Sequence, residues 1–193
     1  MRLALLRRSL MAGLVILLAA CATTNPPVTQ QSSPLSSLDA PWSLQGRIAL
    51  KADDKNLSGQ LQWHHSKDHD ELLLLSPLGQ GVARLVSDAD GVLLEIPNEP
   101  PRRAPNAETL TRDAMGVALP LSGLRYWIEA RPDLARAFEQ RLDDAGRVAK
   151  IRQDGWVIDY LQYMNAPAYR PRKLNVTRET LEIRLVIDSW TTE

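Results

Sequence analysis

Apolar and polar residues alternate along much of the chain from Trp42 onward, which is the pattern of β-strands with one buried face. The alternation over 42–51 predicts a first strand, the polar residues 53–56 predict a turn, and residues 57–64 predict the hairpin partner. Further segments have the same strand character: 72–75, 82–86, 92–96, 141–142, 148–152, 156–163, 173–177 and 181–190. The chain is therefore expected to be mainly β.

The middle of the chain lacks this alternation. The proline-rich segment 97–105 ends the run of strands, Asn106 is expected to cap a helix that stops at Gly116, and Ser122 is expected to cap a second short helix over 124–130. Because strands and helices do not alternate in the way that builds a parallel sheet, an antiparallel arrangement is expected. We expect one large, curled antiparallel sheet of about ten strands, with two or three short helices packed against its concave side.

The amino-terminal residues have the features of an export signal. Arg2, Arg7 and Arg8 precede an apolar run over 10–20, and this run ends in small residues directly before Cys21. The run is shorter than the roughly 20 apolar residues that a membrane-spanning helix needs. The alternative interpretation is an uncleaved amino-terminal anchor, but the flanking pattern favours a signal that is removed.

Residues 18–21, Leu-Ala-Ala-Cys, resemble the bacterial lipobox. The resemblance implies that the signal is cut before Cys21, that the cysteine thiol receives a diacylglycerol, and that the new amino terminus is acylated. With about fifteen methylenes at ~0.8 kcal/mol each, one acyl chain contributes on the order of 12 kcal/mol to membrane partitioning. Ala22 stands where an Asp would resemble an inner-membrane retention signal, which favours the outer membrane. We expect a signal peptide over 1–20, a lipidated flexible tether over 21–40, and a folded domain over 41–193.

Charge and cysteine content exclude several classes of function. The 193 residues carry 23 Lys and Arg against 23 Asp and Glu, so the basic excess that nucleic-acid binding needs is missing. Removal of residues 1–20 takes away three arginines and leaves 20 basic and 23 acidic residues, a formal charge of −3. Because Cys21 is the only cysteine, an internal disulfide and a cysteine-based zinc site are excluded.

Candidate catalytic and metal-binding groups are few. His64, His65 and His69 lie close to acidic residues, but neighbouring residues of a strand point to opposite faces, so we expect a solvated, charged hairpin tip rather than a metal site. Arg102 and Arg103 are expected to be ordinary surface charge. The sequence has neither a G-x-S-x-G segment nor a phosphate-binding glycine-rich motif, so we expect no catalytic residues, metal or cofactor.

Alternation alone favours a filled space under the sheet, because an apolar stripe on a strand is normally packed core, but it cannot detect a void. A curled sheet covered by short helices either packs solidly or holds an apolar ligand. A hollow interior favours a lipid-binding receptor, whereas a solid β core favours a structural outer-membrane lipoprotein that acts as an assembly partner. A lipoprotein hydrolase has no motif to support it.

Six segments resemble, in order, landmarks of the outer-membrane lipoprotein receptor family LolB. They are Trp42-x-Leu44-x-Gly46-Arg47-Ile48-Ala49, Gly59-x-Leu61-x-Trp63, Leu74-x-Ser76-Pro77-Leu78-Gly79, Leu119-Pro120-Leu121-x-x-Leu124-x-Tyr126-Trp127, Gly155-Trp156-x-Ile158-x-Tyr160-x-x-Tyr163 and Ile187-x-x-Trp190. Each is weak alone, but six in sequence behind a lipobox are jointly specific. The chain departs from the family at Ala130, where glycine is expected to end a helix.

The resemblance implies a LolA/LolB-like fold, in which an open, half-barrel antiparallel sheet covers a hydrophobic cavity capped by helices. In the family, the soluble periplasmic carrier LolA delivers acylated lipoproteins, and the receptor inserts them into the inner leaflet of the outer membrane. The expected partners are LolA, lipoprotein cargo and outer-membrane lipid, with the receptor a monomer anchored through Cys21 at the periplasmic face. The cavity has to measure several hundred Å³. The candidates for its acyl-chain lining are Ile48, Trp63, Leu74, Leu85, Leu94, Trp127, Ile158 and Ile183.

The loop Pro77-Leu78-Gly79 is the second candidate site. Proline and glycine place Leu78 in a turn, where a single exposed leucine would ordinarily attract no attention. In the family, the corresponding leucine protrudes into solvent and is associated with release of cargo into the membrane. The resemblance therefore implies that Leu78 contacts the membrane.

Overall fold

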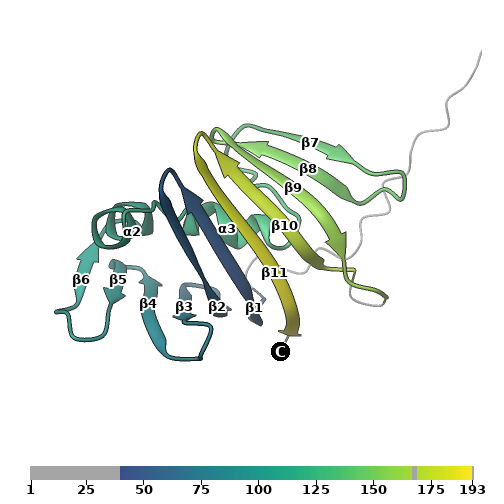
Figure 1. Ribbon diagram of the computed structural model, residues 1–193. Helices are drawn as coiled ribbons and strands as arrows, with labels where there is room; N and C mark the ends of the chain where they lie inside the picture. The colour runs from purple at the N-terminus through teal and green to yellow at the C-terminus, as the bar shows by residue number, and fades with distance from the viewer. Residues whose placement is uncertain (1–39, 167–168, 193) are drawn as a thin grey trace, which may run out of the picture. The chain divides into compact units, whose positions relative to one another are not determined.

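The computed structural model describes residues 40–166 and 169–192. These residues form one open antiparallel sheet of eleven strands in the order β6-β5-β4-β3-β2-β1-β11-β10-β9-β8-β7 (Figure 1). The first group of strands is β1 (Trp42–Ala52), β2 (Lys55–Ser66), β3 (His69–Leu75), β4 (Gly81–Asp88), β5 (Gly91–Glu95) and β6 (Arg102–Ala104). The second group is β7 (Phe138–Leu142), β8 (Val148–Gln153), β9 (Trp156–Tyr163), β10 (Pro171–Arg178) and β11 (Leu181–Thr192). The expected fold class, a mainly β chain with an open antiparallel sheet, is confirmed.

The strand order explains where the helices lie. Successive strands pair as hairpins, and β1 pairs with β11, so the two groups of strands join at the centre of the sheet. Strands β6 and β7 are therefore the two opposite edges, and the chain between them has to cross the full width of the sheet. This crossing contains helices α2 (Ala107–Met115) and α3 (Leu121–Trp127), which cover one face of the sheet.

The buried face of the sheet follows the alternation in the sequence. In β1, for example, every second residue from Trp42 to Leu50 is buried, whereas the residues that alternate with them are half-buried or exposed. Strands β8 to β11 continue the same apolar layer with fully buried residues such as Ile151. The layer meets the apolar sides of α2 and α3, so the core is a single sheet-to-helix interface.

Three details differ from the sequence-based expectation. Strand β6 lies inside the proline-rich segment that was expected to end the strands, and its three residues pair with β5 at an edge, where proline neighbours are tolerated. Strand β7 begins at Phe138 rather than at residue 141. Helix α3 begins at Leu121 after Pro120 and has no side-chain cap, so Ser122 is not its cap as expected. Asn106 does cap helix α2, since its Oδ1 accepts a hydrogen bond from the Thr109 amide, and Gly116 caps the other end, as expected.

The expected solvated tip around the histidines is also wrong for one of them. His64 is exposed and contacts Ser43, but His65 points to the opposite face and is buried with Asp70. Asp70 Oδ1 accepts a hydrogen bond from Trp63 Nε1 and lies 2.8 Å from His65 Nδ1. Burial is tolerated here because the carboxylate has polar partners. Arg102 and Arg103 form surface ion pairs with acidic neighbours, as expected.

Candidate functional site

The eight candidates for an acyl-chain lining lie in one apolar layer. All are buried, with exposed fractions between 0 and 8%, and all belong to the same core cluster. Seven come from strands on both sides of the sheet's centre, and Trp127 comes from α3. The sequence thus identified residues of one buried layer. In the structure these residues belong to the packed core.

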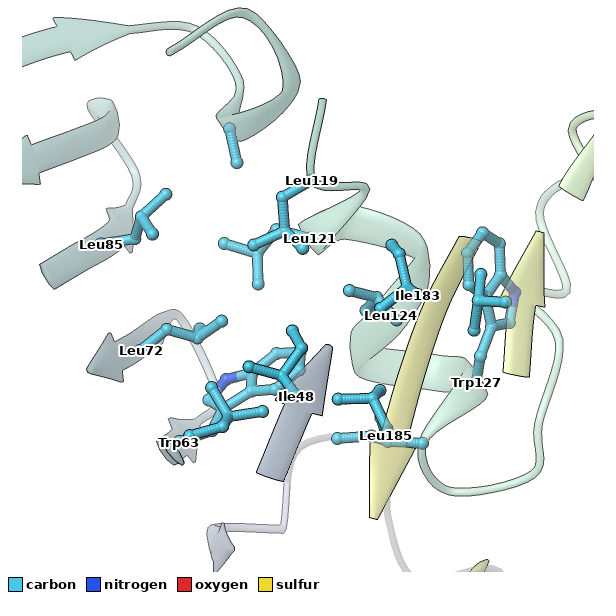
Figure 2. Close-up of a cluster of buried hydrophobic side chains, with 14 of the residues drawn as sticks. Ile48, Trp63, Leu72, Leu85, Leu119, Leu121, Leu124, Trp127, Ile183 and Leu185 are labelled. Carbon is cyan, nitrogen blue, oxygen red and sulfur yellow. The ribbon is translucent and has the colours of Figure 1, made fainter. Parts of the chain in front are cut away.

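The helices fill the space above this layer with their own side chains. Leu110 of α2 and Leu121, Leu124 and Trp127 of α3 are all buried. Figure 2 shows the leucines of the 119–124 segment facing strand residues such as Ile48. The helix leucines therefore stand where a bound acyl chain would have to lie against the sheet.

An apolar pocket of about 180 Å³ remains at one margin of this interface. Ile48, Leu50 and Leu74 form its buried floor, while Leu57 and Val82 stand half-exposed at its rim. Its volume is below the roughly 300–1,000 Å³ of typical ligand pockets. Two larger hollows, of about 550 and 450 Å³, lie beside β7 and are lined partly by charged groups such as Arg152.

Polar contacts between the helices and the sheet gather at the carboxyl end of α3. The Tyr160 hydroxyl of β9 donates a hydrogen bond to the Trp127 carbonyl at 2.7 Å. Gln153 of β8 accepts hydrogen bonds from Trp127 Nε1 and the Asp133 amide and donates one to the Asp133 carbonyl. Burial raises the pKa of Tyr160 well above its usual value of 10.0, which keeps this hydroxyl a donor. These bonds fasten α3 to the second group of strands.

Helix α2 is held differently. Thr111 is fully buried, donates to the Ala107 carbonyl and accepts a hydrogen bond from the Leu119 amide, so it ties α2 to the segment that leads into α3. Toward the sheet, α2 packs on β5 and β6 through apolar residues such as Leu110. The helix pair is therefore fastened by hydrogen bonds at the α3 end and by apolar packing at the α2 end.

The loop between β3 and β4 is a small, hydrogen-bonded turn. The Ser76 amide donates to the Gln80 carbonyl at 2.7 Å, the Gly79 amide donates to the Ser76 carbonyl at 2.8 Å, and Gly79 takes a left-handed φ of 85°. Gln60 Nε2 of β2 donates to the Pro77 carbonyl, which joins the loop to the sheet. Leu78 at the tip is 89% exposed, the highest value among the large apolar side chains of the described residues.

Close backbone contact beneath the loop depends on a glycine. A Cβ at Gly59 would collide with the carbonyl oxygen of Leu75, the last residue of β3 before the loop. Glycine at this position lets β2 and β3 approach each other where the loop begins. Gly59 therefore has a physical role at the base of the loop that carries Leu78.

Sequence reasoning found Ile48, Leu74 and Trp127, but it missed the rest of the apolar side chains around the pocket and the partners that fasten α3. Leu57, Val82 and Met115 had no signal beyond ordinary apolar character, since their contacts depend on tertiary packing. Tyr160 could have been found, because it follows Ile158 by two residues and therefore lies on the same, buried side of β9. Within residues 40–166 and 169–192, no group of three or more His, Cys, Asp or Glu side chains is placed to hold a metal ion.

The expected signal peptide and Cys21 lie outside the described residues. Of the helices in the part that is described, none is long and apolar enough to cross a membrane.

Comparisons with known proteins agree with this architecture. A crystal structure of a DUF1329-family protein from Desulfovibrio piger has a similar fold, with a TM-score of 0.55 at 8% identity over 80% of this chain and 86% of that one. Outer-membrane lipoprotein LolB of Thiobacillus denitrificans is 54% identical over 184 residues, which cover 95% of this chain and 97% of the relative. The LolB of Cupriavidus pinatubonensis is 35% identical over 91% of this chain and 90% of the relative. The family model described as outer membrane lipoprotein LolB matches residues 40–190, and the chain therefore belongs to the LolB family.

Proposed function

We propose that this chain is an outer-membrane receptor that accepts acylated lipoproteins from the soluble carrier LolA and inserts them into the inner leaflet of that membrane. The observation that carries the proposal is a wide apolar sheet face that, in the described residues, is covered by two short helices and lies next to a protruding leucine. Membership of a family whose curated relatives are named outer-membrane lipoproteins supports the location. The role is one of binding and transfer, without catalysis.

The physical need for such a receptor comes from the acyl chains of the cargo. Exposure of one chain to water costs on the order of 12 kcal/mol, so a triacylated protein has to stay covered on its way to the bilayer. Hand-over from carrier to receptor to membrane then runs downhill if each acceptor binds the chains more tightly than the donor does. An apolar sheet face can cover the acyl chains, because the hydrophobic interaction is non-directional and any hydrocarbon chain can take part in it.

Cargo binding requires α2 to give up its place on the sheet, while hydrogen bonds hold α3 to the second group of strands. The two helices have nine and seven residues, shorter than the roughly 12–15 residues that a helix needs to be stable alone in water. Their stability therefore comes from packing, and acyl chains offer the sheet an equivalent apolar partner. The packed interior is, in this proposal, the empty state of the receptor.

The anchor and the membrane contact complete the proposal. We assign residues 1–20 to a signal peptide, Cys21 to lipid attachment and 21–40 to a tether for the domain 41–193, which acts as a monomer at the periplasmic face. Leu78 is held out by the hydrogen bonds of its loop and meets the bilayer when cargo is released. The seven buried candidates on strands, from Ile48 to Ile183, form the sheet side of the acyl-chain site, and Trp127 of α3 faces them from the helix side.

One observation favours the second candidate function. Because the interior is filled by the protein's own side chains, a structural outer-membrane lipoprotein with a solid β core is the alternative. The two are separated by mixing LolA loaded with a fluorescent triacylated lipoprotein with vesicles that carry the lipidated chain. A receptor moves the cargo from LolA to the vesicles, and vesicles without the chain serve as the control. Cargo that stays on LolA while the chain is folded would support the structural role.

A further inference from the structure

The apolar pocket marks the place where the core reaches the surface. Its floor is formed by the core residues Ile48, Leu50 and Leu74, and its rim by Leu57 and Val82. None of the twelve residues that line it is charged. The pocket therefore suits a hydrocarbon chain, which is stabilised by apolar contact alone.

Two polar side chains of the pocket lining, Ser76 and Gln60, already have hydrogen-bond partners. The Ser76 hydroxyl accepts a hydrogen bond from the Gln80 amide, and Gln60 Nε2 donates to the Pro77 carbonyl. These bonds hold the β3–β4 loop in place. Pro77 itself lines the pocket, so the exposed Leu78 follows directly after a pocket residue.

The third wall of the pocket is the end of α2. Met115, the last residue of this helix, lines the pocket and packs against the core, and Gly116 follows with a left-handed φ of 72°. The hydrogen bonds between helix and sheet in the described residues lie at the opposite end of the helix pair, around Trp127. Movement of α2 away from the sheet thus widens this pocket while α3 stays attached.

We propose that this pocket is the portal through which an acyl chain of the cargo enters and leaves the space between sheet and helices. The inference rests on the proposed function and adds the route to it. In the structure the pocket admits only the end of a chain, and displacement of Met115 opens it into the core. Because the portal adjoins Leu78, a chain released through it passes into the bilayer without crossing water.

A bulky side chain at the rim tests the portal. Leu57→Trp and Val82→Trp fill the opening, and Leu161→Trp is the matched control because Leu161 of β9 is 54% exposed and does not line the pocket. With the lipidated full chain in vesicles, we expect the two rim variants to take cargo from the carrier at least tenfold more slowly than wild type, and the control to stay within twofold. Rim variants with the wild-type rate would overturn the portal.

A second measurement avoids the bulky residues, in case they disturb folding. Cys21 is the only cysteine and is acylated in the lipidated chain, so a cysteine introduced by Leu57→Cys can be labelled alone with bimane. Cargo that carries a nitroxide at the end of an acyl chain should quench this label on binding and should leave a label at Leu161→Cys unchanged. Equal fluorescence with and without bound cargo at residue 57 would contradict the portal.

The source of the chain and the underlying function are tested in the same series. When the nitroxide is placed at the end of a vesicle phospholipid chain and cargo is absent, the bimane at residue 57 should not be quenched. Quenching equal to that caused by labelled cargo would overturn the assignment of the portal to cargo. If the wild-type chain itself takes no cargo, the proposed function fails and the portal with it. If wild type takes cargo and the rim variants do so equally well, only the portal fails.

Discussion

Replacement of Leu78 by glutamate should separate acceptance of cargo from its deposition. Full transfer of a leucine side chain from water to apolar surroundings is worth about 1.5–3 kcal/mol. Because Leu78 is 89% exposed, nearly all of this free energy is still to be gained on contact with the bilayer. At 1.4 kcal/mol per factor of ten, its loss slows deposition by about 10- to 150-fold, and the carboxylate adds a dehydration cost.

The assay measures two steps on the same protein. Transfer from LolA to the receptor should be unchanged in Leu78→Glu, and the free energy of unfolding should stay within about 0.5 kcal/mol of wild type, because an exposed loop tip makes few contacts. Only the appearance of cargo in the vesicle lipid should slow down. Leu78→Ala removes the leucine without adding a charge, so its effect should be smaller.

The matched control is Leu134→Glu. Leu134 is also a strongly exposed leucine, at 71%, but it lies in the connection before β7 and outside the β3–β4 loop. This control should deposit cargo at the wild-type rate. Equal deposition by Leu78→Glu and wild type would refute the reasoning, and equal impairment by both variants would show that the loss comes from surface charge in general.

Three further predictions concern the helix layer. Gly123→Ala should lower the free energy of unfolding by about 1–2 kcal/mol in urea titrations, because the new Cβ collides with the buried Trp127 ring and the overpacking exceeds the gain in helix propensity. Ala130→Gly should raise it by about 0.5–1 kcal/mol, because Ala130 has a left-handed φ of 58° at the end of the helix segment; an unchanged value would argue against strain there. Since burial raises the pKa of Tyr160, above pH 10 only the unfolded chain ionises this group, so stability should fall by about 1.4 kcal/mol per pH unit. Tyr160→Phe should remove this contribution to the slope of unfolding free energy against pH between pH 10 and 12. Loss of the hydrogen bond should also lower the free energy of unfolding by about 1 kcal/mol at neutral pH. An unaltered slope would contradict the assignment of the pH dependence to Tyr160.

Strands were the most predictable part of the fold, because apolar and polar residues alternate along a strand that has one buried face. Residues 42–51 and 57–64 show this alternation in β1 and β2. The Asp154-Gly155 turn was equally readable, and it joins β8 and β9. Strand β6 could not be found this way, since its three residues depend on pairing with β5 rather than on a pattern of their own. The start of α3 was misplaced because Ser122 has the features of a cap, whereas packing of Leu121 decides where the helix begins.

The candidate site was predictable in part for a related reason. Alternation identified which residues share the buried face, and Ile158 and Ile183 lie there as expected. Alternation carries no information on what covers that face, so the packing of α2 and α3 against it came only from the structure. The burial of His65 with Asp70 was missed because charged residues near a turn usually face solvent, and here a hairpin partner and Trp63 enclose them.

The claim that cargo replaces α2 on the sheet is tested most directly by a distance measurement between spin labels. One label replaces Arg112, exposed on α2, and the other replaces Arg184 of β11, which lies between the buried Ile183 and Leu185 and therefore on the opposite face of the sheet. Loading with acylated cargo should lengthen this distance by at least about 4 Å, the separation of carbon atoms in contact, while a label pair at Glu139 and Arg184 within the sheet stays constant. Bound cargo with an unchanged distance between α2 and β11 would contradict the account.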